Sequence, residues 1–255
     1  FIGSLGHNRL LINNGDGTFH DATIALGKVD DRFTTSLAIA DVNSDGLPDL
    51  YEAIYIEMDG AFDLPKKDAD GRELQPSPLK HFADSDRWFK NQGNGLFEAR
   101  TISRDVAKPG TSLGLIVTDF NGNGQNEVFV GNDVRANHFL VQNGENGFSN
   151  AADISGVANG FSGAANGCMG IAPGDYNRDG ELDLFITNFS EESANLYIQQ
   201  TAGGFTDLAI RYEIDTISLP LVGFGTKAID LDRNGWLDLV VTNGHIFDMT
   251  YYGED

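Results

Sequence analysis

Residues 173–188 have the sequence PGDYNRDGELDLFITN, in which an acidic loop, residues 175–183, separates two short apolar runs. Short runs rich in β-branched and aromatic residues predict β-strands, and the Asp, Asn and Gly residues between them predict a tight turn. The same arrangement occurs three more times, as IADVNSDGLPDLYEAI, VTDFNGNGQNEVFVGN and AIDLDRNGWLDLVVTN. Self-similarity of this kind is typical of repeat architectures.

A second element also recurs in each unit. It consists of an apolar strand, a Gly/Asn turn and a strand that begins with phenylalanine, at Phe19, Phe97, Phe148 and Phe205. Each unit therefore predicts four strands, named here a to d, with the acidic loop between a and b and the Gly/Asn hairpin between c and d. Four antiparallel strands in about 55 residues are typical of a propeller blade. The sequence thus predicts an all-β fold, a β-propeller of four-stranded blades.

The repeats also predict the domain organisation. We expect a single β-propeller domain or fragment over residues 1–255, with a partial blade 1–22, a blade 36–101 with a loop insertion 57–85, a blade 112–152, a blade 168–210 and a partial blade 223–247. Because the chain starts and stops within a blade, we expect an arc of a larger propeller. The alternative is a closed four-bladed propeller, but in it the opening FIGSL, which resembles the end of a strand b, would compete with the last strand b for one place.

The acidic loops follow the pattern D-x-[DN]-x-[DN]-G-x-x-[DE] in all four units. Calcium takes six to eight oxygen ligands, from carboxylates, amide carbonyls and backbone carbonyls, whereas magnesium demands a tighter octahedral geometry. A simple turn does not require an acid at position 9 each time, so the four loops predict up to four Ca²⁺ sites. The predicted ligands, with a backbone carbonyl at position 7, are Asp41, Asn43, Asp45, Leu47 and Asp49; Asp119, Asn121, Asn123, Gln125 and Glu127; Asp175, Asn177, Asp179, Glu181 and Asp183; and Asp230, Asp232, Asn234, Trp236 and Asp238.

Composition limits the partners. The formal net charge of −21 argues against nucleic acid and against anionic membranes, since both are polyanions. No run of 18 apolar residues predicts a transmembrane helix, and the first residues lack the basic region of a signal peptide. The single cysteine, Cys168, excludes an intrachain disulfide and is expected to be a buried small hydrophobe.

The four loops, with GIAPG (170–174) before Asp175 and Phe224-Gly225 before Asp230, resemble the FG-GAP/VCBS repeat family, the calcium-bearing propellers of integrin α-subunit heads. The combination of NNGDGTF, GDYNRDGELDLF and VTNGH is similar, more specifically, to the cartilage-acidic-protein/UnbV-type group. The resemblance implies about seven blades, an extracellular, cell-surface or periplasmic location, and binding or adhesion rather than catalysis.

Other motifs carry weaker signals. Residues 110–114 fit the G-x-S-x-G pattern of a nucleophile elbow, but they lead into a strand rather than a helix, so we expect no catalysis by Ser112. Asp68 and Asp70 in the insertion could form a fifth metal loop. An enzymatic function would need acid and base groups that converge, such as His81, Asp84 and Asp86.

We therefore expect a calcium-stabilised extracellular module that binds a protein or a glycan and has no catalytic activity. In a propeller the b–c and d–a connections lie opposite the a–b loops, so the ligand is expected on the loop face opposite the calcium loops, because binding residues concentrate on loops held by a rigid scaffold. Two alternatives stay open: a scaffold domain of a secreted polysaccharide-active enzyme, or a structural subunit of a surface assembly. Further blades or domains of the same polypeptide are also expected partners.

Overall fold

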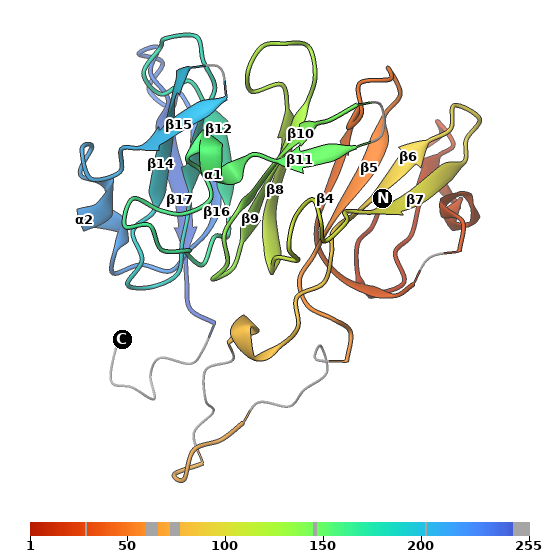
Figure 1. Cartoon of the computed structure of the whole chain (residues 1–255), viewed down its shortest axis with the longest axis horizontal. Helices are drawn as coiled ribbons and strands as arrows, with labels where there is room; N and C mark the ends of the chain where they lie inside the picture. The colour runs from red at the N-terminus through yellow and green to blue at the C-terminus, as the bar shows by residue number, and fades with distance from the viewer. Residues whose placement is uncertain (29, 60–65, 72–76, 145–146, 202, 247–255) are drawn as a thin grey trace.

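The computed structural model describes residues 1–28, 30–59, 66–71, 77–144, 147–201 and 203–246. The fold is mostly β, and its antiparallel sheets stand side by side in a row (Figure 1). The apolar runs form the strands and the Gly/Asn-rich segments form the turns. The predicted four-stranded antiparallel sheets are thereby confirmed.

Each sheet follows the order of its strands in the chain. The first contains β4 (Arg32–Ala40), β5 (Asp49–Ile54), β6 (Arg87–Asn91) and β7 (Phe97–Thr101); the second β8 (Ser112–Thr118), β9 (Glu127–Asn132), β10 (His138–Gln142) and β11 (Phe148–Asn150); the third β12 (Ile171–Gly174), β13 (Asp183–Ile186), β14 (Asn195–Thr201) and β15 (Gly204–Asp207). A short strand, β1 (Leu5–Gly6), lies at the end of the opening segment that the sequence likened to a strand b; its pairing with β4, which was not predicted, makes the first sheet five-stranded.

Two-stranded sheets lie at the ends of the row. One is the hairpin of β2 (Leu11–Asn13) and β3 (Phe19–Asp21), and the other pairs β16 (Gly223–Ile229) with β17 (Asp238–Asn243). Across the described ranges, β17 forms no ladder with β2. The closed four-bladed ring of the alternative interpretation is therefore not formed. The predicted blade boundaries, the last of which reaches residue 247 outside the described residues, stay a prediction.

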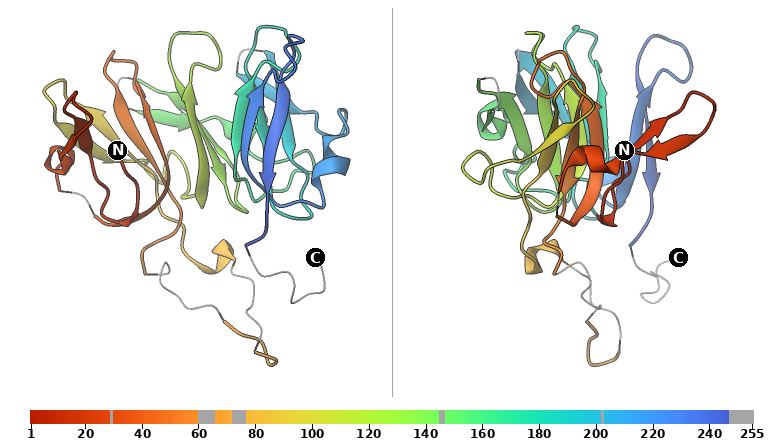
Figure 2. Two further views of the ribbon diagram at one scale, coloured as in Figure 1. Left: turned by 180° about the vertical axis from the view of Figure 1, so that it is seen from behind. Right: turned by 90° about the vertical axis from the view of Figure 1, so that its right-hand side faces the viewer.

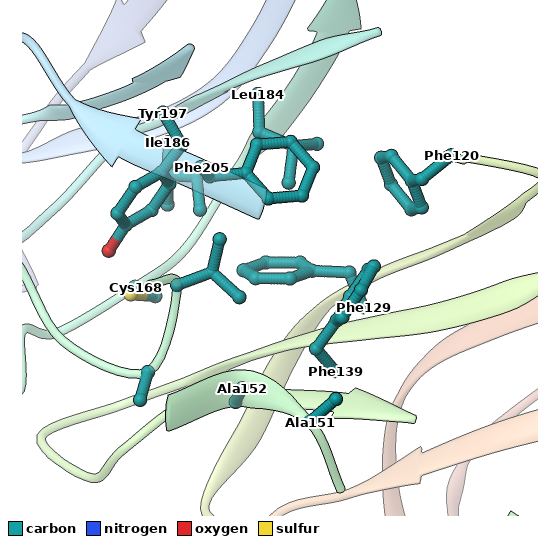
Figure 3. Close-up of a cluster of buried hydrophobic side chains, with 12 residues drawn as sticks. Phe120, Phe129, Phe139, Ala151, Ala152, Cys168, Leu184, Ile186, Tyr197 and Phe205 are labelled. Carbon is teal, nitrogen blue, oxygen red and sulfur yellow. The ribbon is translucent and has the colours of Figure 1, made fainter. Parts of the chain in front are cut away.

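The hydrophobic core lies between consecutive sheets. Leu140 of β10 and Phe148 of β11 join a buried cluster with Tyr51 and Trp88 of the preceding sheet and with Val42 of the first acidic loop. The next interface repeats this arrangement: Tyr197 of β14 and Phe205 of β15 join Phe120, Phe129 and Phe139 (Figure 3). The rings of Phe120 and Phe205 meet edge to face, with centroids 6.0 Å apart. Each sheet is thus held by side chains that its second, third and fourth strands place against the sheet before it.

The loops divide between two edges of the row. The four acidic loops, which connect β4–β5, β8–β9, β12–β13 and β16–β17, lie at the top in Figure 1, and the described part of the 57–85 insertion, with η2 (Pro78–Lys80), lies at the bottom. Both views of Figure 2 show the same separation. Three further short helices, η1 (Thr23–Leu26), α1 (Ala152–Ser155) and α2 (Ile214–Ser218), lie between consecutive sheets in the chain. Within the described ranges, every helix falls short of the length and apolarity that a membrane span requires.

Candidate metal centres

The four acidic loops share one backbone conformation. The residue at position 4 has a positive φ in every loop: 57° at Ser44, 70° at Gly122, 62° at Arg178 and 61° at Arg233. The glycine at position 6 also has a positive φ, between 85° and 92°. A Cβ at Gly46, Gly124 or Gly180 would meet no atom within 4 Å, so the backbone conformation, and not a lack of space, favours glycine there.

Two hydrogen-bond patterns repeat in all four loops. The carboxylate at position 1 accepts the backbone N–H groups of positions 5 and 6 at 2.8 to 3.1 Å. The carboxylate at position 9 accepts the N–H of position 2 at 2.8 to 3.2 Å. These bonds hold two acids on each loop, and a carboxylate that accepts one such bond per oxygen still has lone pairs for a cation.

The fourth loop brings its acids closest together. Carboxylate oxygens of Asp230, Asp232 and Asp238 all lie within 4.8 Å of one another. Three like charges at this spacing repel one another, and hard oxygen donors are the ligands that calcium prefers. This acidic cluster brings together three of the predicted ligands of the fourth site, and the side-chain amide of Asn234 lies beside them, donating to Asp232 at 2.9 Å. The Trp236 carbonyl stays a predicted ligand.

The first loop contains an unpartnered donor for a cation. Asn43 is buried and its Nδ2 donates to Asp45, while its Oδ1, within the described residues, accepts no hydrogen bond. A buried amide oxygen without a partner is costly, and a bound cation would satisfy it. The ammonium of Lys90 lies 3.1 Å from Asp45 and balances part of the loop's negative charge. The residues of this loop therefore fit calcium.

Burial sets the electrostatics of the position 9 carboxylates. It raises the pKa of Asp49, Glu127 and Asp183, and the charges of the neighbouring loop aspartates raise these pKa values further. Backbone N–H groups oppose this effect. In the first and third loops the second oxygen accepts an N–H from the next strand of the same sheet, that of Asn91 at 2.7 Å and that of Gln199 at 2.8 Å. A bound dication would stabilise the charged forms of these acids.

The second loop differs in its position 9 residue. Both oxygens of Glu127 are engaged within the loop, Oε2 by the N–H of Phe120 at 2.8 Å and Oε1 by the amide of Asn121 at 2.6 Å. The longer glutamate side chain thus folds back onto its own loop. The remaining predicted ligands, including the backbone carbonyls of Leu47, Gln125 and Glu181, stay predictions.

Groups considered for catalysis have structural partners. Ser112 is fully buried, and its hydroxyl, which has one hydrogen to donate, lies 2.9 Å from Asp86 Oδ1 and 3.1 Å from Asn132 Oδ1. Burial raises the pKa of Asp86 to about 7. Asp84 pairs with Arg32.

Cys168 is buried as predicted, and burial raises the pKa of its thiol to about 12. In the insertion the N–H of Asp70 donates to Asp68 at 2.9 Å, and a metal site there stays a prediction.

A groove of about 750 Å³ lies among the connections on the side away from the acidic loops. It is lined by residues 104–110, 134–138 and parts of 150–165, and it contains the basic side chains of Arg104, Lys108 and Arg135. In the described part of the chain, Lys108 and Arg135 have no carboxylate partner, and the Nε of Arg135 is buried without a hydrogen bond. The sequence predicted a ligand on the loop face opposite the acidic loops but indicated none of the residues of this groove. The basic side chains stand beside two acids of the same lining, Asp105 and Asp153, so no basic run marks the groove in the sequence.

One residue of the groove has an unusual backbone. Val134 has a φ of 53°, which is a genuine outlier for a β-branched residue, and its N–H donates to the carbonyl of Asn166 at 2.9 Å. Backbone strain of this kind costs about 1–3 kcal/mol and clusters at functional sites.

Comparisons with known proteins agree with the repeat pattern. The FG-GAP-like repeat matches residues 1–52, 119–186 and 175–241. Cartilage acidic protein 1 from Mus musculus is 29% identical over 161 residues, which cover 61% of this chain and 24% of that protein. The Homo sapiens protein is 30% identical over 184 residues, which cover 57% of this chain and 27% of that protein. The chain spans about a quarter of the length of these curated relatives.

Two solved structures are distantly similar. The exotype rhamnogalacturonan lyase YesX gives a TM-score of 0.44 at 11% identity, over 94% of this chain and 41% of that chain. An Agrocybe aegerita lectin that recognises non-reducing terminal N-acetylglucosamine gives a TM-score of 0.37 at 16% identity, over 94% of this chain and 69% of that chain.

Proposed function

The chain belongs to the FG-GAP-like repeat family, and from this premise we propose that it is an arc of a calcium-stabilised β-propeller that acts as an extracellular binding module without catalytic activity. Its ligand is a protein or a glycan. The observation that carries the proposal is the separation of two features: the acidic loops lie on one edge of the row of sheets, and the groove lies among the connections of the other.

A pocket beside β17 supports the arc. It has a volume of about 350 Å³ and is lined by apolar side chains that include Phe185, Leu239 and Val241. In the two preceding interfaces the corresponding place is filled by side chains from the third and fourth strands of the following sheet, such as Tyr197 and Phe205. In the described residues the sheet of β16 and β17 has only its first two strands. Strands c and d of that blade, supplied by further polypeptide, would fill the pocket.

The groove supports binding. Its lining has three basic side chains and two acids, Asp105 and Asp153, and carboxylate or sulfate groups of a ligand would pair with Lys108 and Arg135. The strained Val134 is consistent with a backbone shaped for recognition. An extracellular location is consistent with exposed calcium loops, because extracellular modules bind calcium with Kd values of about 10⁻⁴ to 10⁻³ M.

Ligand capture tests the binding function. An array of acidic and neutral glycans, followed by capture of proteins from an extracellular fraction, is expected to yield a ligand whose binding weakens at least about tenfold in Lys108→Ala and falls with salt. Lys227→Ala, an exposed lysine on β16, is the matched control. A ligand that binds both variants equally would refute the assignment to the groove.

Chelation tests the scaffold. Each site adds about 2.7 kcal/mol to stability when calcium is at 100 times its Kd, so EDTA should lower the melting temperature markedly. An unchanged melt, together with no calcium in metal analysis, would contradict the proposal.

A further inference from the structure

The loops are tied to the sheet that follows them. The side-chain amide of Gln199, which is 1% exposed on β14, donates to the backbone carbonyl of Phe120 in the second acidic loop at 3.0 Å. The equivalent residue one sheet earlier, Gln142 of β10, donates to the carbonyl of Val42 at 3.2 Å and to Ser44 at 2.7 Å, both in the first loop. Phe120 and Val42 both occupy position 2 of their loops. The same contact therefore recurs at two successive interfaces.

Gln199 also contacts the loop of its own sheet. Its backbone N–H donates to Asp183 Oδ1 at 2.8 Å, and its side-chain amide donates to Glu181 at 3.0 Å. On the other side, the N–H of Phe120 donates to Glu127 Oε2 at 2.8 Å. A path of hydrogen bonds that passes through the backbone of Phe120 and through Gln199 thus joins the position 9 ligands of two loops, Glu127 and Asp183.

We propose that Gln199 is a positioning residue that couples the second and third calcium sites, so that filling either site raises the affinity of the other. The inference rests on the proposed calcium function. A cation held by Glu127 fixes the Phe120 N–H and so restrains the backbone of that residue, whose carbonyl in turn holds the Gln199 amide. Gln199 in turn holds Asp183 in its binding position, which lowers the ordering cost of the third site. Coupling between sites is reciprocal, so the effect runs in both directions.

Gln142 does not complete the same path. Its side chain reaches the first loop, but among the described hydrogen bonds its backbone N–H does not reach Glu127. Asn126 makes a separate contact with the first loop, donating to the carbonyl of Asp41 at 2.8 Å. Gln142 therefore serves as a matched control for Gln199, because it holds the same strand position without joining the ligands of sites two and three.

The experiment isolates the second site with a local probe. Position 7 supplies only its backbone carbonyl, so Gln125→Trp in a Trp236→Phe background gives the second loop the one tryptophan of the four acidic loops. Excitation at the red edge of the tryptophan band, where Tyr176 of the third loop does not absorb, then sensitises terbium luminescence at the second loop. Calcium affinity is read by displacement of terbium. The third site is weakened by Asp179→Asn, which removes one of its carboxylates; among the described hydrogen bonds Asp179 makes none with Gln199, Phe120 or Asp183.

The inference predicts that Asp179→Asn weakens calcium binding at the second site by about fivefold or more. Gln199→Asn keeps the amide but shortens the side chain by one methylene. In a Gln199→Asn background, Asp179→Asn should therefore leave calcium affinity at the second site unchanged. In a Gln142→Asn background, Asp179→Asn should still weaken it. The inference is overturned if Asp179→Asn alone leaves calcium affinity at the second site unchanged, or if it still lowers that affinity in the Gln199→Asn background. Either result would leave the proposed calcium sites intact. If Gln199→Asn fails to fold, comparing second-site calcium affinity with and without Asp179→Asn still tests whether the two sites are coupled. A second loop that binds no calcium would overturn the proposed function as well.

Discussion

Replacing Asp232 by asparagine should change stability in opposite directions with and without calcium. The oxygens of Asp232, Asp230 and Asp238 lie within 4.8 Å of one another. Two unit charges at that distance repel by about 0.9 kcal/mol in bulk water and by about 3.5 kcal/mol at an effective dielectric constant of 20. Because Asp232 is exposed, the lower value applies, and removing its charge relieves two such pairs. The metal-free protein should gain about 1–2 kcal/mol in free energy of unfolding.

With calcium the sign reverses. The same substitution removes one carboxylate from a three-carboxylate site, and ligand charge is a main determinant of calcium affinity. A loss of about 1.4 kcal/mol weakens binding tenfold, so at least this reduction is expected at the fourth site. Trp236 fluorescence reports calcium binding at this loop, because the side chain is 49% exposed and the Arg178 guanidinium lies 5.0 Å from its ring centroid. Trp88 is buried and gives a constant background.

Urea unfolding in EDTA gives the metal-free stability, and Trp236 fluorescence during a calcium titration gives the affinity. Asp105→Asn, an exposed acid of the groove on the side away from the acidic loops, is the control and should change neither quantity. The reasoning is refuted if Asp232→Asn destabilises the metal-free protein, or if it binds calcium as tightly as the parent does.

Three further predictions concern the other loops and the buried acid. The second loop should fill last in a calcium titration followed by ion occupancy in crystals, because it has two carboxylates and both oxygens of Glu127 are already engaged. Asp183→Ala should destabilise the protein more than Ser112→Ala in urea unfolding, since it leaves the N–H groups of Tyr176 and Gln199 without an acceptor, at about 1–3 kcal/mol each. Burial raises the pKa of Asp86 to about 7, so between about pH 4 and 7 the unfolded chain loses a proton that the folded chain keeps, and stability falls as pH rises. Asp86→Asn should reduce this slope, by up to about 1.4 kcal/mol per pH unit, in unfolding curves measured in EDTA across that range.

The sequence predicted the strands and loops because their signals are local. Apolar runs of four to seven residues and the D-x-[DN]-x-[DN]-G pattern each specify a few adjacent dihedral angles, and every acidic loop lies between two strands as expected. The left-handed conformation at position 4 was not predicted, since arginine at 178 or 233 carries no preference for it. It is imposed by the hydrogen bonds that each loop makes to its first aspartate.

The sequence did not predict the long-range contacts, for a different reason. Gln199 and Phe120 are 79 residues apart, and nothing in a glutamine at the end of an apolar strand indicates which carbonyl it will reach. The groove likewise gathers Arg104 and Arg135 from two separate connections. The pairing of Leu5–Gly6 with β4 depends on the path of the chain before the first sheet, whereas the sequence indicated only a likeness to strand b.

The way in which the sheets pack has a consequence for synthesis on the ribosome. The side chains that close each interface come from the later sheet, as Tyr197 and Phe205 do against Phe120 and Phe129. Domains emerge from the N-terminal end at about 5–20 residues per second. By the time Tyr197 leaves the ribosome, the sheet that receives it is already complete, so each new sheet can assemble on a finished surface. We expect the chain to fold vectorially, one sheet at a time, with little need for contacts between its distant ends.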